Sequence, residues 1–313
     1  MNTSDKNLRR YLEKNYGLRI RRVTKIKHGM LNRNYRVLTE QGDFLFKNYL
    51  LRTPRETAYE LTLLEALRQA DFPCPRIFRD LRGALQVMWR GRPGVLFGFI
   101  PGKSVKRLTP AHLKRVGAQL GRMHQLLKNA RLPSVKRDQW GFAEVARLIR
   151  TRRQEIVRKN FPDGAAMVEF IAREFSRLKP HDHLPQGITH QDVKPENIIR
   201  DDAGRLSFID FDNAYRGALL TDLATTVIWT CFPGGKLRPA LLRVLLKGYE
   251  SERKLTRAER AAFAEVMKFR LLREAFAWPL RFAPAKAIKN NSHFLAAYRD
   301  FGRQAQSRER PWK

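Results

Sequence analysis

Two short segments of the chain carry side chains whose types and spacing could do chemistry. Residues 187–200 contain His190, Asp192 and Asn197 in the pattern H-x-D-x4-N, and residues 206–212 form an apolar run that reaches Asp210. Phosphoryl transfer from ATP needs one carboxylate that orients the attacking hydroxyl. It also needs an oxygen ligand and a second carboxylate that hold Mg²⁺. Asp192 fits the first role, and Asn197 and Asp210 fit the metal role.

A turn links these two segments. The residues between them, Asp201-Asp-Ala-Gly204, are of the types that favour turns, and an apolar run stands on either side. This pattern predicts a hairpin that folds Asp210 back beside Asn197. We therefore expect the side chains of Asp192, Asn197 and Asp210 to converge.

The two segments resemble the catalytic and metal loops of the protein-kinase-like superfamily. The resemblance is strongest to the branch that contains aminoglycoside phosphotransferases, choline kinases and homoserine kinases, and it implies a kinase that uses ATP and Mg²⁺. It also implies that His190 and Asp222, the latter in Asp-Leu-Ala, brace the catalytic loop. Lys194 stands where Ser/Thr protein kinases have a lysine that meets the transferring phosphate, so it is assigned a catalytic role beside Asp192.

The first third of the chain is similar to the nucleotide-binding part of the same branch. Gly29, Asn32 and Asn34-Tyr35 resemble its G-x-x-N-x-N-[YF] loop, and Lys47 matches its third-strand lysine. Glu60 matches the helix residue that pairs with this lysine. The resemblance implies nucleotide binding by six residues: Gly29, Asn34, Lys47, Glu60, Phe99 and Ile100.

Several of these side chains also have simpler structural interpretations. Lys47 could be a solvated strand lysine, and Glu56 competes with Glu60 as its partner. His124, in a segment similar to the branch's L-A-x-x-H, is expected to pack or to cap rather than to bind a metal. Asp212 could touch a second metal ion or form a surface ion pair.

We expect the phosphoryl acceptor to be a hydroxyl of a small molecule. Only eleven residues separate Asp210 from Asp222, which leaves no room for the activation segment on which protein kinases hold a peptide. Within the branch the chain most resembles homoserine kinase-type enzymes, although Gln191 and Asp212 are more like spore-coat kinase-like members. Homoserine, a sugar or an amino alcohol is the expected acceptor. A kinase acting on a protein or a cell-surface polymer, and a non-catalytic nucleotide-binding relative, remain as alternatives.

The elements that must position these residues follow from local patterns. Strands are expected within residues 20–49 and over residues 85–89 and 95–100, and a helix is expected from Pro54, capped by Thr53 with Glu56. Pro101-Gly102 breaks the chain. Beyond it the pattern is helical from Thr109, with breaks near 162–164, at 233–235 and at Pro284. Short strand signals around residues 187–212 predict one small β region within this helical part.

This order predicts an α+β, protein-kinase-like fold with two lobes. The small antiparallel β lobe, with one helix, is expected to span residues 1–100 and to bind the nucleotide. The larger, mainly helical lobe is expected to span residues 101–313 and to hold the catalytic loop and the acceptor.

The chain is strongly basic, with 62 Lys and Arg against 30 Asp and Glu, a formal charge of +32. Such a field would suit an anionic acceptor and would repel a polycationic aminoglycoside. It is also compatible with nucleic acid or an anionic surface, but no nucleic-acid-binding motif is evident. The two cysteines form no metal or disulfide pattern. The first residues, MNTSDKNLRRYLEKNYG, have no apolar region of the kind found in a secretory signal. The most apolar stretch, near 218–232, is too short and polar to span a membrane, so we expect a cytoplasmic protein.

Overall fold

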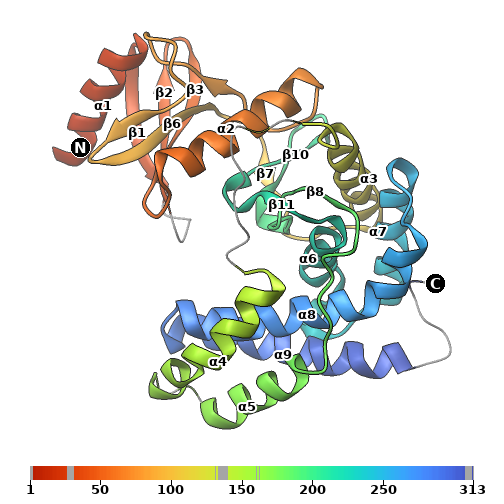
Figure 1. Cartoon of the computed structure of the whole chain (residues 1–313). Helices are drawn as coiled ribbons and strands as arrows, with labels where there is room; N and C mark the ends of the chain where they lie inside the picture. Colours follow the sequence, from red (N-terminus) through yellow and green to blue (C-terminus); the bar gives the residue numbers. More distant parts are fainter. Residues whose placement is uncertain are drawn as a thin grey trace. The chain divides into compact units, whose positions relative to one another are not determined.

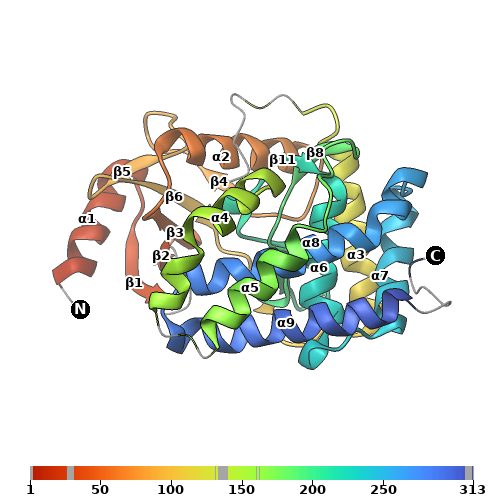
Figure 2. The ribbon, with the colours of Figure 1, turned by 60° about the horizontal axis from the view of Figure 1, so that its bottom comes forward.

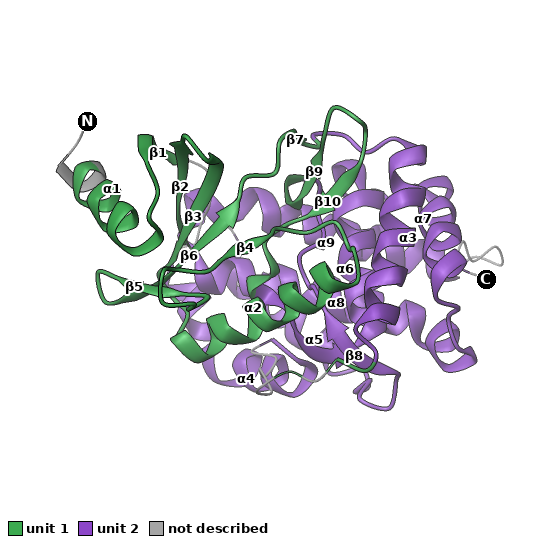
Figure 3. Cartoon of the chain, turned by 90° about the horizontal axis from the view of Figure 1, so that it is seen from above, with its two compact units in different colours: residues 1–105, 129–136, 196–212 green, residues 106–128, 137–195, 213–313 purple. Residues whose placement is uncertain are grey.

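The computed structural model describes residues 3–26, 32–130, 132, 140–159, 161, 163–306 and 312. The chain divides into two compact units, coloured separately in Figure 3. Unit 1 comprises residues 1–105, 129–136 and 196–212, and unit 2 comprises residues 106–128, 137–195 and 213–313. These units are defined by contacts and combine several segments of the chain. The predicted boundary between a nucleotide-binding lobe and a catalytic lobe, after residue 100, stays a prediction.

Unit 1 is built on an antiparallel sheet, as predicted (Figure 1). Its main strand order is β1-β2-β3-β6-β4, and β5 pairs with β6. Alternating apolar residues bury one face, and Val37 and Phe46 are fully buried there. The strands are β1 (Ile20–Ile26), β2 (Asn32–Thr39), β3 (Gly42–Tyr49), β4 (Ile77–Phe78), β5 (Val87–Trp89) and β6 (Arg92–Gly98).

Helix α2 (Pro54–Gln69) begins where the sequence predicted. The Thr53 side chain accepts a hydrogen bond from the backbone N–H of Glu56, and the Glu56 side chain accepts one from the backbone N–H of Thr53. Each side chain thus satisfies a backbone donor that has no partner within the helix. The predicted capping box is confirmed, and it fixes the start of the helix that carries Glu60.

The prediction of a single helix in this part of the chain is wrong, because α1 (Thr3–Tyr16) precedes the sheet. Figure 1 shows it alongside β1. Its apolar residues are few, but Leu8 and Leu12 lie four positions apart and are fully buried against the sheet. Together with Tyr16 and the partly buried Tyr11, these leucines dock a helix that is otherwise highly charged. This weak i, i+4 signal in the sequence could have identified the helix.

A second, smaller sheet completes unit 1. Strand β9 (Ile198–Arg200) pairs with β10 (Leu206–Phe208) and with β7 (Lys103–Ser104). The Phe208 ring packs edge-on against Phe72, with 5.8 Å between the ring centroids. The β9–β10 pair is the hairpin that the turn at residues 201–204 predicted. Gly102 has a φ of +130°, and a Cβ there would lie 2.3 Å from the Arg200 carbonyl oxygen, so only glycine fits this approach.

Unit 2 combines one short strand pair with most of the helices. Strand β8 (Gln186–Thr189) pairs with β11 (Tyr215–Ala218). Figure 2 shows the two longest helices, α8 and α9, side by side. The predicted breaks near 162–164, at 233–235 and before Pro284 are confirmed. The helices are α3 (Pro110–Leu126), α4 (Phe142–Arg158), α5 (Gly164–Phe175), α6 (Leu219–Cys231), α7 (Pro239–Glu252), α8 (Arg257–Arg281) and α9 (Pro284–Gln306).

One helix boundary in unit 2 was not predicted. The chain leaves α7 at Arg253 and enters α8 after Thr256, whose side chain forms a second capping box with Glu259. The signal was present in the sequence as a Thr followed three residues later by a Glu. Among the described residues, no helix is long and apolar enough to cross a membrane.

Candidate active site

Lys47 lies at the centre of a charged cluster inside unit 1. It is carried by β3 and is only 5% exposed. Its Nζ is 2.6 Å from an oxygen of Asp210, 3.5 Å from one of Glu60 and 3.7 Å from one of Asp212. Burial acts to lower the pKa of Lys47, but the three carboxylates outweigh it and raise this pKa well above its usual value. The side chain is therefore charged at neutral pH, and because it is buried among carboxylates the interpretation of Lys47 as a solvated strand lysine is wrong.

The partner of Lys47 on α2 is Glu60, as favoured from the sequence. Glu60 is 3% exposed. The rival residue, Glu56, uses its carboxylate in the helix cap at Thr53. The helix thus assigns the two glutamates different tasks, one at its exposed start and the other in the charged cluster.

The β9–β10 hairpin brings Asn197 and Asp210 together within unit 1. Asn197 comes directly before β9, and Asp210 follows two residues after β10. The backbone N–H of Ile209 donates to the carbonyl oxygen of Asn197 at 3.0 Å, which extends the hairpin to Asn197 and to the residue directly before Asp210. Asp210 has a φ of +67°, a left-handed conformation that is costly for a residue with a Cβ. This conformation turns the chain sharply directly after the hairpin.

Asp212 is also part of this cluster. It is 4% exposed, and its Oδ2 accepts a hydrogen bond of 2.8 Å from the side-chain amide of Asn32. The interpretation of Asp212 as half of a surface ion pair is wrong, because its carboxylate is buried beside Lys47. The sequence marks Asn32 only as part of the G-x-x-N-x-N-[YF] pattern, and nothing in it indicates a hydrogen bond to an aspartate 180 positions away.

The remaining nucleotide-binding predictions fall at different places in unit 1. Asn34 pairs with Lys47 across β2 and β3, so its side chain projects from the same face of the sheet. Phe99 and Ile100 follow β6 and are half-buried, and the Arg36 guanidinium lies 4.5 Å from the centroid of the Phe99 ring. Gly29 lies outside the described residues. The roles of these residues in nucleotide binding stay predictions.

The catalytic loop of unit 2 is held by Asp222, in the first turn of α6. The backbone N–H groups of His190 and Gln191 each donate a 2.7 Å hydrogen bond to this carboxylate. Burial acts to raise the pKa of Asp222, but hydrogen bonding from His124 and the charges around it lower it below the usual value. Asp222 is thus an ionised acceptor that grips the loop backbone, as the prediction of a bracing role requires.

The side chains of Asp192 and Lys194, both in this loop, form an ion pair. The Lys194 ammonium donates to both oxygens of Asp192, at 2.9 and 2.8 Å. It also lies 5.6 Å from the centroid of the Trp229 ring on α6. Gln191 has a φ of +66°. Both segments that were identified from the sequence therefore contain a non-glycine residue in the left-handed region, and such conformations cluster at functional sites.

The division between the units falls between Pro195 and Glu196, inside the H-x-D-x4-N motif. Asp192 belongs to unit 2, and Asn197 and Asp210 belong to unit 1. The juxtaposition of Asn197 with Asp210 is therefore a feature of one unit. The convergence of Asp192 with both of them stays a prediction.

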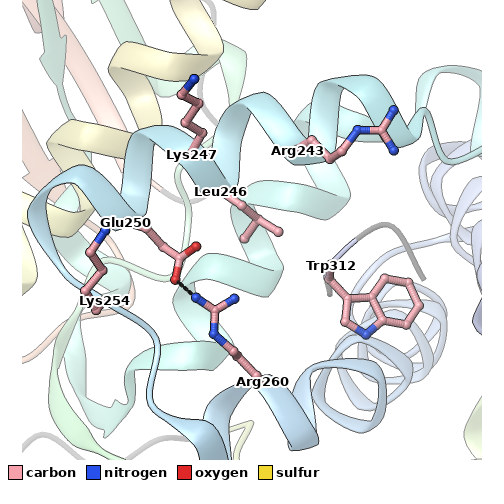
Figure 4. Close-up of a pocket in the computed structure, with 7 residues that line it drawn as sticks. All are labelled: Arg243, Leu246, Lys247, Glu250, Lys254, Arg260 and Trp312. Atoms are coloured by element: carbon pink, nitrogen blue, oxygen red, sulfur yellow. Dashed lines mark hydrogen bonds and ion pairs between the residues drawn. The ribbon is translucent and has the colours of Figure 1, made fainter. Parts of the chain in front are cut away.

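A cavity of about 270 Å³ opens elsewhere in unit 2, between α7, α8 and Trp312 (Figure 4). Arg260 pairs with Glu250 within it, and Leu246 and Trp312 supply apolar walls. Figure 4 shows Lys247 on the opposite side of α7 from Leu246, so the basic side chains do not converge on one point. None of the predicted site residues lines this cavity, and we do not assign the active site to it.

An antiparallel sheet with α2 in one unit, and a loop braced from a helix in the other, are the features of a protein-kinase-like fold. Solved structures support this class. An aminopropanol kinase associated with a microcompartment has a TM-score of 0.68 at 18% identity and covers 96% of this chain and 98% of its own. Choline kinase from Cryptosporidium parvum has a TM-score of 0.67 at 14% identity and covers 96% of each chain.

Sequence comparison defines the family. The model of the phosphotransferase enzyme family matches residues 22–261, and the chain belongs to this family. Homoserine kinase from Caulobacter sp. strain K31 is 31% identical over 240 residues, which are 76% of this chain and 74% of the relative. Homoserine kinase from Gluconacetobacter diazotrophicus is 32% identical over 245 residues, with the same coverage. The predicted fold class and enzyme class are confirmed: the chain is a kinase that transfers a phosphoryl group from ATP to a hydroxyl of a small molecule.

Proposed function

We propose that the acceptor is homoserine or a closely related amino alcohol, and that Asp192 orients its hydroxyl for attack. The proposal is supported by the names of relatives that are about 30% identical over three quarters of the chain. The observation that carries the residue roles is the buried cluster in which Lys47 meets Glu60 and Asp210. A lysine is buried among carboxylates only at a desolvation cost, which suits a site that must hold phosphate and metal charge.

In unit 1, we assign phosphate binding to Lys47 and Mg²⁺ binding to Asn197 and Asp210. Three carboxylates face one ammonium, so the cluster has an excess of two negative charges when all of them are ionised. Amide and carboxylate oxygens suit a hard divalent cation. Mg²⁺ is usually held by one or two protein ligands together with substrate phosphates, so Asn197 and Asp210 can suffice as its ligands from the protein. When bound, Mg²⁺ would neutralise charge on the phosphate oxygens.

In unit 2, we assign the acceptor hydroxyl to Asp192 and the transferring phosphoryl group to Lys194. The ion pair between them keeps the Asp192 carboxylate in one orientation, from which it can accept the hydroxyl proton. Lys194 can release one of its two hydrogen bonds to meet phosphate oxygens. Asp222 acts through the loop backbone and touches neither substrate.

The chain's location and the charge of its acceptor follow from the same proposal. A kinase that uses ATP and a free amino acid suits the cytoplasm, where we place it. The formal charge of +32 also favours acceptors that carry an anionic group. Homoserine has a carboxylate and meets this condition, whereas choline does not.

The test is a screen of ATP consumption with homoserine, serine, choline, 1-amino-2-propanol and glucose 6-phosphate, with the product identified by ³¹P NMR. We expect turnover with homoserine and a phosphate ester as product. Replacing Asp192 by Ala should lower kcat by about 10²–10⁴-fold without weakening nucleotide binding. Asp182→Ala, which alters an exposed aspartate ahead of β8, is the matched control and should retain activity.

Two results would overturn the proposal. If another compound in the screen is phosphorylated at a much higher kcat/KM than homoserine, the acceptor assignment is wrong. Full turnover by Asp192→Ala would contradict the role of the loop carboxylate, whatever the acceptor.

A further inference from the structure

A chain of buried hydrogen bonds continues from Asp222 away from the catalytic loop, entirely within unit 2. His124 on α3 lies between two partners: its Nε2 is 3.0 Å from Asp222 Oδ2, and its Nδ1 is 2.7 Å from the hydroxyl of Tyr249 on α7. None of these three side chains is more than 3% exposed. His124 is therefore packed in the interior, as predicted, and each of its two ring nitrogens also has a hydrogen-bond partner.

This series of hydrogen bonds ends in a buried ion pair between Arg253 and Glu259. The Arg253 guanidinium donates to the Tyr249 hydroxyl oxygen at 3.0 Å and to Glu259 Oε1 at 2.9 Å. The second carboxylate oxygen of Glu259 accepts the backbone N–H of Thr256 in the cap of α8. Glu259 has no exposed surface. Buried charges need complete hydrogen bonding, and here each charged group has at least two partners.

When His124 is a neutral imidazole, the donors and acceptors along this series of hydrogen bonds are satisfied by one arrangement of protons. Asp222 is ionised and can only accept, so the proton between Asp222 and His124 is on Nε2. Burial raises the pKa of Tyr249, so its hydroxyl keeps its proton. Its oxygen accepts from Arg253, and its proton is therefore donated to His124 Nδ1. From Arg253 through Tyr249 and His124, each of these three hydrogen bonds is donated toward Asp222, and hydrogen bonds aligned in this way strengthen one another.

Glycines set the spacing of the two helices that carry His124 and Tyr249. A Cβ on Gly248 of α7 would lie 1.9 Å from the carbonyl oxygen of Lys114 on α3. A Cβ on Gly121 of α3 would lie 2.6 Å from the carbonyl oxygen of Tyr249. The two backbones are thus in direct contact. This close approach lets a tyrosine hydroxyl on one helix reach a histidine on the other.

We propose that Tyr249, supported by Arg253 and Glu259, is a positioning residue for the catalytic loop: it holds His124 as the hydrogen-bond donor to Asp222, which in turn holds the backbone of His190 and Gln191. The proposal rests on the proposed role of Asp192, because that carboxylate is presented by the loop that Asp222 grips. The effect of Tyr249 is on the geometry of the loop and not on substrate binding. Its loss should therefore lower kcat and leave KM unchanged.

The first test is Tyr249→Phe, which removes the hydroxyl and keeps the ring. We expect kcat to fall about tenfold, with KM for ATP and acceptor within about twofold of the parent. Tyr298→Phe is the matched control, because Tyr298 is also buried in unit 2 and donates its hydroxyl proton to one carboxylate, that of Glu174, at 3.0 Å. This control should leave kcat unchanged. Equal kcat values in the two variants would overturn the proposal.

The second test does not depend on an acceptor. The backbone amides of His190 and Gln191 donate to Asp222, so their hydrogen exchange reports the grip on the loop directly. We expect these amides to exchange about tenfold faster in Tyr249→Phe and to be unchanged in Tyr298→Phe. If no acceptor is turned over, faster exchange still supports the positioning role, and unchanged exchange refutes it.

Arg253→Lys provides a milder second variant if Tyr249→Phe does not fold. Lysine keeps the charge but cannot reach Tyr249 and Glu259 with a planar fork, so an intermediate exchange rate is expected. Parent-like exchange at both loop amides in Arg253→Lys, together with parent-like kcat, would contradict the support that we assign to Arg253.

Discussion

Replacement of Lys47 by Met measures how much the positive charge of Lys47 contributes to the stability of the buried cluster in unit 1. Methionine keeps much of the length of the side chain and removes only its ammonium group. The carboxylates of Glu60 and Asp212 are nearly inaccessible and would be left close together with little water between them, whereas the Asp210 side chain is 38% exposed. The variant therefore removes the one ammonium that attracts these three carboxylates and leaves only the repulsion among them.

The distances set the size of the effect. At an effective dielectric constant of about 20, unit charges about 3–4 Å apart attract by about 4–6 kcal/mol. Desolvation of the ammonium and repulsion among the carboxylates offset most of this, and water screens the contact with Asp210. Removing one partner of a buried ion pair typically costs about 3–5 kcal/mol, and we expect Lys47→Met to lower the free energy of unfolding by this amount.

Urea denaturation followed by circular dichroism measures this change. Lys25→Met, an exposed lysine on β1, is the matched control and should change the free energy of unfolding by less than about 0.5 kcal/mol. Glu60→Gln should destabilise less than Lys47→Met, because Lys47 retains Asp210 and Asp212. If Lys47→Met is as stable as Lys25→Met, the ammonium does not stabilise the cluster, and our account of Lys47 fails.

Two other predictions concern packing and thiol chemistry. Gly248→Ala should destabilise the protein by about 3 kcal/mol or more in thermal denaturation, because the new Cβ would overlap the α3 backbone. Gly302→Ala, in an open part of α9, should instead stabilise it by up to about 1 kcal/mol, and equal effects would contradict the packing argument. Burial raises the pKa of Cys74 and of Cys231 to about 12, so at pH 8 only about one part in ten thousand of either is thiolate. Neither should react with iodoacetamide unless the chain is unfolded, and rapid labelling of folded protein at pH 8 would refute this.

Local sequence determined the elements that carry the site. The capping box at Thr53, the turn at residues 201–204 and the alternation in residues 44–49 act over a few neighbouring residues. Short-range hydrogen bonds and steric preferences decide such features, so they can be predicted without the rest of the chain. The same is true of the proximity of Asn197 and Asp210, because a hairpin of fixed length joins them.

Tertiary structure alone decided the partners that are distant in sequence. Asp212 was ambiguous until the fold placed it 3.7 Å from Lys47 and within hydrogen-bond distance of Asn32. Nothing in the sequence around Tyr249 indicates its hydrogen bond to His124, which is 125 positions away. Such contacts depend on how whole helices and strands pack, and a carboxylate or hydroxyl has the same local sequence pattern whether packing buries it or leaves it in water.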